Sequence, residues 1–132
     1  MPSIFSKIIN REIPAHIVAE NDDFLAFLDI NPLMEGHCLA IPKVDVDYIY
    51  DLEDETLAGL HLFAKRVALG IQAAIPCERI AVSVLGLEVP HAHVHLIPMN
   101  SMDDANFARP KLKPSQEELA ETAQMIKSAI EL

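Results

Sequence analysis

The sequence predicts an α+β fold with an antiparallel sheet, and three observations support this. The chain contains five short strand-like runs, one long amphipathic helix between the third and fourth runs, and a second helix near its end. Strands therefore cluster at both ends of one helix, which disfavours a doubly wound parallel sheet. With 132 residues, 51% of them hydrophobic, we expect a single domain, residues 1–132, with its own core.

The elements before the long helix are short. Residues 4–9 form an apolar helix candidate, and strand-like runs follow at 16–20 and 24–28. Three polar residues separate these two runs, so they indicate a β-hairpin. A third run, 37–41, ends at a proline and predicts another strand.

The long helix is predicted over residues 53–74. Its apolar positions recur at three- and four-residue steps, and acidic residues crowd its first turn, where the helix dipole favours them. These positions are Leu57, Leu60, Phe63, Ala64, Val67, Ile71 and Ala74. Pro76 then ends the helix.

The remaining elements are two strands and a helix. Apolar runs at 80–85 and 89–97 predict the strands. Ser115 and Glu118 form a Ser-x-x-Glu capping box that marks the start of the helix. Its apolar face consists of Leu119, Ala123, Ile126 and Ile130.

Charge and composition exclude several classes of function. The formal net charge is −10 with only ten Lys and Arg residues, so the basic surface that grips a nucleic-acid polymer is missing. No apolar run approaches the roughly 20 residues that cross a bilayer, and the first residues lack the features of a secretory signal. We therefore expect a cytoplasmic protein without a membrane partner, with Cys38 and Cys77 as reduced thiols.

Half of the histidines stand at alternate positions in His91-Ala92-His93-Val94-His95. In a strand, His91, His93 and His95 would share one face, and the apolar residues between them would pack on the other. A neutral imidazole can act as a nucleophile while a neighbouring ring donates a proton. The middle residue, His93, is the best nucleophile because it alone has an imidazole on each side.

The same spacing also suits a metal site. Imidazoles two apart on a strand can ligate one zinc ion, and His37 or Asp45 could complete the coordination sphere. Three consecutive histidines on a straight strand are too far apart to reach one ion comfortably. The residues alone leave this alternative open.

The motif His-φ-His-φ-His-φ-φ, with φ apolar, closely resembles the hallmark of the histidine triad (HIT) family. Here it stands as residues 91–97. The segments 4–9, 12–14, 26–32 and 36–43 also resemble the N-terminal half of that family, in the same order. The layout is most similar to the small nucleoside-phosphoramidase branch.

This resemblance implies a fold, a mechanism and an assembly. It implies a five-stranded antiparallel sheet with two main helices, extended to ten strands in a homodimer. It also implies attack by His93 on the α-phosphate of a purine nucleotide substrate, a nucleotidyl-histidine intermediate and release of the nucleoside monophosphate by water, with no cofactor and no catalytic metal. By the same resemblance, His95 assists the leaving group, and His91 and His37 hold the neighbouring ring and backbone.

The resemblance further implies a nucleotide pocket. Asp29 corresponds to the residue that binds both ribose hydroxyls, a role that suits a carboxylate. The apolar residues around the base are Ile4, Phe5, Ile8, Phe27 and Ile30, and the residues before the triad that correspond to the phosphate loop are Ser83, Gly86, Glu88 and Val89.

Two departures from the family pattern stand out. The loop before the triad is shorter and less polar, and Glu88 replaces a hydroxyl residue that would contact phosphate, which places an anion beside an anion. We hypothesise that Glu88 meets a cationic leaving group such as an amine. Where some family members bind zinc, this chain has Ser3, Ser6 and Asp45 with His91, so we expect no structural zinc.

Three functions follow from the sequence, in descending order of support. The first is a metal-independent nucleotide hydrolase of the phosphoramidase type. The second is a nucleotide-binding regulatory dimer that has lost turnover through its altered loop. The third is a metal-dependent hydrolase with the triad as ligands.

Overall fold

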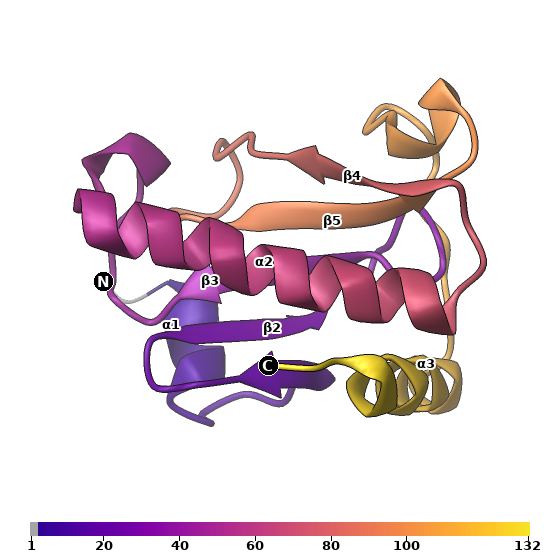
Figure 1. Ribbon diagram of the computed structural model, residues 1–132, viewed down its shortest axis with the longest axis horizontal. Coiled ribbons are helices and arrows are strands. Elements are labelled where there is room, and N and C mark those ends of the chain that lie inside the picture. The colour runs from indigo at the N-terminus through magenta and orange to yellow at the C-terminus, as the bar shows by residue number, and fades with distance from the viewer. Residues whose placement is uncertain (1–2) are drawn as a thin grey trace.

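The computed structural model describes residues 3–132 and shows a five-stranded antiparallel sheet with helices on both faces (Figure 1). The strands are β1 (Ile17–Glu20), β2 (Phe24–Leu28), β3 (Cys38–Pro42), β4 (Arg79–Ser83) and β5 (Val94–Met99), in the spatial order β1-β2-β3-β5-β4. The three α-helices are α1 (Ile4–Ile9), α2 (Asp54–Ala74) and α3 (Gln116–Ala129), and two 3-10 turns span Ile49–Asp51 and Met102–Ala105. The predicted α+β class and antiparallel sheet are confirmed.

The helices divide the apolar residues into two clusters. In Figure 1, α2 crosses the near face of the sheet, α3 lies beside it, and α1 lies behind the strands. The larger cluster joins the sheet to α2 and α3, and it includes Leu60, Phe63 and Val67 at the predicted apolar positions. The smaller cluster joins α1 to the other face through Phe5 and Ile8. The central strands are therefore buried on both faces.

Local signals in the sequence explain the helix ends. Ser3 caps α1, because its hydroxyl accepts a hydrogen bond from the backbone N–H of Ser6 at 3.0 Å. The capping box of Ser115 and Glu118 is present at the start of α3, as predicted. Gly70 of α2 faces Ile130 so closely that an added Cβ would lie 3.0 Å from the Ile130 Cα.

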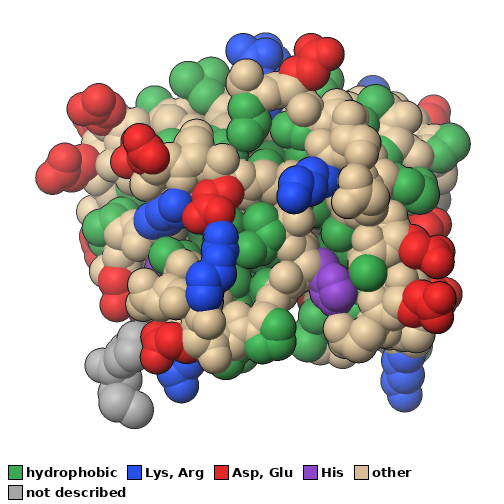
Figure 2. All heavy atoms as spheres, turned by 90° about the horizontal axis from the view of Figure 1, so that it is seen from below, with side chains coloured by type: hydrophobic (Ala, Val, Ile, Leu, Met, Phe, Trp, Pro, Cys, Tyr) green, Lys and Arg blue, Asp and Glu red, His purple; other side chains and the backbone are tan. Residues whose placement is uncertain are grey.

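Charge is spread unevenly over the surface. On the face in Figure 2, acidic side chains gather toward both sides, while the middle is mixed. Lys43 pairs with Glu20 at 2.8 Å, and Arg11 pairs with the same carboxylate. Among residues 3–132, no helix has the length and hydropathy of a membrane span. Cys38 is buried, and neither it nor Cys77 forms a disulfide.

Candidate active site

The four candidate histidines gather on the side of the sheet that α1 covers. His95 in β5 pairs with Leu39 of β3, whose side chain belongs to the α1 cluster. His37 directly precedes β3 and Asp29 directly follows β2. The antiparallel pairing of these strands therefore places both residues at the same end of the two strands. His37, His91, His93 and His95 are only 0–8% exposed. Such burial limits the conformations that each ring can adopt.

The predicted strand 89–97 is wrong at its start. β5 begins at Val94, so His91 and His93 lie in the connection that precedes it. The His91 N–H donates to Val89 O at 2.8 Å in a tight turn, and Pro90 has no N–H for a strand ladder. β4 likewise ends at Ser83 instead of residue 85.

The side chains of residues 92–96 still alternate between the two faces of the sheet. Ala92, Val94 and Leu96 belong to the cluster beneath α2. The His93 ring instead lies edge-on to Phe5 of α1, with ring centroids 5.1 Å apart. The chain before β5 is thus extended enough to separate the two sets of side chains.

Main-chain oxygens fix the protonated nitrogen of His91 and of His93. His91 Nε2 lies 2.8 Å from Pro42 O, and His93 Nδ1 lies 2.7 Å from His91 O. A carbonyl oxygen can only accept, so each of these nitrogens carries a proton. In neutral His93 the lone pair is therefore on Nε2, which has no hydrogen-bond partner among residues 3–132.

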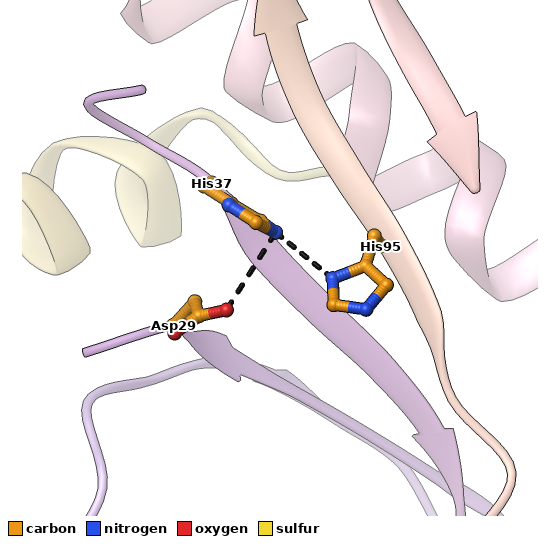
Figure 3. A group of neighbouring side chains, drawn as sticks. All are labelled: Asp29, His37 and His95. Carbon is orange, nitrogen blue, oxygen red and sulfur yellow. Dashed lines mark hydrogen bonds and ion pairs between the residues drawn. The ribbon is translucent and has the colours of Figure 1, made fainter. Parts of the chain in front are cut away.

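In the other pair, His37 and His95, the hydrogen bonds leave a proton on His95 Nε2, the position where neutral His93 has its lone pair. The Leu33 N–H donates to His37 Nδ1 at 3.1 Å, so the proton of neutral His37 lies on Nε2. That nitrogen is 3.0 Å from His95 Nδ1, which must accept (Figure 3). His95 therefore carries its proton on Nε2. The ring centroids of His93 and His95 are 5.0 Å apart, so a ring with a lone pair on Nε2 and a ring with an Nε2–H donor are neighbours.

Burial keeps the second pair neutral. It lowers the pKa of His37 from 6.5 to about 3, with a smaller contribution from His95. Burial also lowers the pKa of His95 to about 4, and the nearby His93 acts in the same direction. At neutral pH the His95 Nε2–H is therefore a neutral donor.

Two phenylalanines enclose the row of imidazoles. Phe5 lies edge-on to His91 and His93, and Phe107 lies edge-on to His95 and His37 with centroids 4.8 Å and 6.2 Å away. Edge-to-face contacts of this kind are favourable and hold ring planes in place. Phe107 was not among the site residues predicted from the sequence. It comes from the segment between β5 and α3, which shows no periodic pattern.

The predicted base-pocket residues fall into two groups. Phe5, Ile8 and Phe27 are at most 7% exposed and form part of the α1 cluster. Ile4 and Ile30 are 53% and 56% exposed and remain open to a ligand. Burial raises the pKa of Asp29 from its ordinary value, although its Oδ1 accepts the Asn31 N–H.

The predicted phosphate-loop residues are also divided. Ser83 pairs with His95 across β4 and β5, so both side chains share a face. Gly86 has a φ of +76° and borders a hollow of about 410 Å³ that His93 also lines. Glu88 is exposed, and Val89 packs against the α1 cluster.

The four positions that correspond to a zinc site do meet. His91 Nδ1 lies 3.1 Å from Ser3 Oγ, 3.4 Å from Ser6 Oγ and 3.7 Å from the Asp45 carboxylate. One imidazole, two hydroxyls and a carboxylate lack the thiolate and additional imidazole ligands that zinc prefers. The residues do not fit zinc, and the hydroxyls serve instead as hydrogen-bond partners of His91 Nδ1.

Asp29, His37 and His95 also place three possible ligand atoms within 4.8 Å of one another. A neutral histidine that binds a metal through Nε2 must carry its proton on Nδ1. His37 Nδ1 accepts the Leu33 N–H, so it has no room for that proton. The hydrogen bonding thus favours a His37–His95 hydrogen bond over a metal centre.

Comparisons with known sequences identify the family to which the chain is similar. The HIT domain model matches residues 10–102. An uncharacterized HIT-like protein of Borreliella burgdorferi is 37% identical over 113 residues, covering 80% of this chain and 81% of that protein. The adenosine 5′-monophosphoramidase HNT1 of Saccharomyces cerevisiae is 40% identical over 100 residues, or 72% of this chain and 61% of the yeast protein.

Solved structures show the same arrangement. A HIT-like protein from Bartonella henselae has a TM-score of 0.85 at 32% identity and covers 97% of this chain and 96% of its own. A zinc-bound histidine triad family protein from Mycobacterium smegmatis has a TM-score of 0.82 at 26% identity, covering 96% and 91%. With the histidine motif, the sheet and the matched domain in agreement, the chain belongs to the HIT family.

Proposed function

We propose that the protein is a metal-independent nucleotide hydrolase that cleaves purine nucleoside phosphoramidates, or related nucleotides, at the α-phosphate. One observation carries this proposal: His93 offers an Nε2 lone pair beside the Nε2–H of His95. Such a pair can attack phosphorus and stabilise charge on the departing group. The phosphoramidase activity named for the yeast relative supports the choice of substrate.

The reaction has two steps. His93 Nε2 forms a bond to phosphorus as the bond from phosphorus to the leaving nitrogen breaks, and that nitrogen takes a proton from water. The positive charge on the nucleotidyl-imidazole is shared with its Nδ1–H, which His91 O accepts. The hydroxide left by that water then attacks phosphorus as the bond from phosphorus to His93 Nε2 breaks, so the nucleoside monophosphate departs and neutral His93 is restored. His95 Nε2–H stabilises the phosphoryl or leaving-group atom in both steps.

The remaining site residues have proposed roles in binding. Asp29 accepts the ribose hydroxyls, and the exposed Ile4 and Ile30 border the base. Ser83 and Gly86 face the phosphoryl group from the β4 side. Glu88, exposed at the rim, accepts a cationic leaving group such as an amine.

A homodimer through β4 is part of the proposal. β4 is an edge strand, and large apolar side chains near it are exposed: Val82 at 59% and Leu85 at 54%, with Leu62 at 65% and Leu69 at 52% on α2. Unpaired edges and apolar patches of this kind usually have a partner. Light scattering that gives the mass of one chain at micromolar concentration would contradict the dimer.

The decisive experiment measures release of nucleoside monophosphate from an adenosine 5′-phosphoramidate, with and without excess chelator. The parent should turn over in both conditions, and His93→Ala should lose on the order of 10⁵-fold in kcat because its nucleophile is gone. Inhibition by the chelator would favour a metal-dependent hydrolase. Tight binding of the monophosphate without turnover would favour a regulatory binding protein.

A further inference from the structure

The segment between β5 and α3 covers the His37–His95 end of the site. Its Phe107 ring packs on both imidazoles, and the Leu112 N–H donates to Pro32 O at 2.8 Å, close to Asp29 in the chain. Leu112 also borders a hollow of about 370 Å³ that Asp29 and His37 line. This segment therefore forms one wall of the space beside the catalytic pair.

Lys111, which precedes Leu112 in this segment, has no carboxylate partner for its charge. Its Nζ donates to Phe107 O at 2.6 Å and to Arg109 O at 3.2 Å, and it lies 5.9 Å from the centre of the Phe107 ring. Among residues 3–132, no carboxylate lies within 4.0 Å of it, whereas Arg109 in the same segment pairs with Asp103 and Asp104. An ammonium has three donors, so one N–H of Lys111 is left for a ligand.

The charge of Lys111 counteracts the negative charge around Asp29. Burial raises the pKa of Asp29, the charge of Glu88 acts in the same direction, and the charge of Lys111 opposes them. Among residues 3–132, Lys111 is the only lysine or arginine whose charge acts on the pKa of both Asp29 and His37. A nucleotide brings further negative charge to a site already flanked by two carboxylates, in a chain of net charge −10. A fixed cation would offset that repulsion.

We propose that Lys111 binds the phosphate of the substrate nucleotide and is a specificity-determining residue of the site. Its two main-chain hydrogen bonds hold the ammonium at the wall formed by Phe107, and its third N–H meets a phosphoryl oxygen. The inference rests on the proposed nucleotide chemistry, but it concerns binding and can be tested without turnover. It predicts that Lys111 contributes to affinity for AMP and not to affinity for adenosine.

The test compares the binding of AMP and of adenosine by calorimetry. In Lys111→Met, the affinity for AMP should fall about tenfold, as expected for one lost hydrogen bond to a charged group, and the affinity for adenosine should stay constant. Lys111→Arg should retain most of the AMP affinity. Lys65→Met removes the same charge from an exposed position on α2 and should change the AMP affinity by less than about twofold.

Each outcome has a clear meaning. Equal effects of the Lys111 and Lys65 variants on the affinity for AMP would overturn the proposal. An equal loss of AMP and adenosine affinity in Lys111→Met would also overturn it, because Lys111 would then act only by shaping the wall. If the parent binds AMP in the predicted manner but does not hydrolyse the phosphoramidate, the hydrolase proposal fails and the role of Lys111 stands. If the parent does not bind AMP, both fail.

Discussion

The two histidine pairs of the site are built alike and prepared for opposite roles. In each pair, the main chain fixes the tautomer of a buried helper histidine, and the helper fixes its partner. His91 presents its carbonyl oxygen to His93, which leaves a lone pair at the far nitrogen. His37 presents an N–H to His95, which leaves a proton at the far nitrogen.

This difference between the two pairs indicates that the chemical role proposed for each ring depends on its hydrogen-bond partner, and not on the residue type. Both rings belong to histidines two positions apart and are similarly buried. One hydrogen bond to a carbonyl and one to an imidazole N–H distinguish the proposed nucleophile from the proposed donor. Removing either hydrogen bond should therefore change or abolish the role of one ring, while both rings remain in the site.

Among changes to the contacts behind the two rings, the largest effect is expected at the His37–His95 contact. In His37→Phe, His95 Nδ1 loses its donor, so the His95 proton can move to Nδ1 and the donor at Nε2 is lost. We expect kcat for the phosphoramidate to fall on the order of 10²-fold, as for other residues that fix a catalytic or metal-binding imidazole.

A conservative variant sharpens this prediction. The amide nitrogen of His37→Gln can lie near the place of Nε2 and donate to His95, so this variant should regain part of the lost kcat. Steady-state kinetics of both variants would decide, with circular dichroism as a check on folding. Equal activity of the Phe and Gln variants would show that His37 acts through packing alone.

A smaller effect of the same contact is expected in stability against pH. The pKa values of His37 and His95 in the folded protein are about 3 and about 4, below the ordinary 6.5, so the unfolded chain binds more protons between these values. The contribution of each histidine is complete above pH 6.5 and is lost as pH falls, by up to about 1.4 kcal/mol per pH unit. Asp29 acts in the opposite sense above its ordinary pKa of 3.8, because its pKa is raised in the folded protein.

Denaturant unfolding between pH 7.5 and 4.5 measures this slope. His95→Asn should show a shallower loss of unfolding free energy on acidification than the parent, because one of the two depressed groups is absent. His16→Asn, at a partly buried site outside the two pairs, serves as the control. A slope unchanged in His95→Asn would mean that His95 is not held neutral by burial.

The sequence predicted the sheet and the main helices because periodicity and capping residues are local signals. Leu60 and Val67 stand at helical spacing, and Ser115 and Glu118 mark the start of α3. The start of β5 could not be predicted in this way, because Pro90 and the turn at His91 interrupt an apolar alternation that reads as continuous strand. The faces of the histidines were nevertheless predicted correctly.

The candidate site was predicted only where its residues lie in the motif or in segments that resemble the family. Phe107 and Lys111 come from an irregular segment, and their place beside His95 depends on how that segment folds back onto the sheet. The tautomers also escaped prediction, because they depend on Leu33 N–H and Pro42 O. Main-chain groups have no signature in a sequence.

The smallest effect is expected at the hydroxyls around His91. The hydroxyl groups of Ser3 and Ser6 lie within 3.4 Å of His91 Nδ1, and the Asp45 carboxylate lies 3.7 Å from the same nitrogen. In Ser3→Ala/Ser6→Ala, His91 loses both neutral partners at Nδ1 but keeps its Nε2–H bond to Pro42 O. We expect kcat to fall only a few-fold to about tenfold, since His93 is still bonded to the carbonyl of residue 91.

NMR of ¹⁵N-labelled histidine provides the matching readout, because the two nitrogens of a neutral ring have distinct shifts. In the parent, His91 should be protonated at Nε2 and His93 at Nδ1. In the double variant, the Nδ1 shift of His91 should change because its hydroxyl partners are gone, while His93 keeps its tautomer. A loss of activity as large as that of His37→Phe would instead mean that the serines orient His93 itself, and that the two pairs are equally dependent on the side chains behind them.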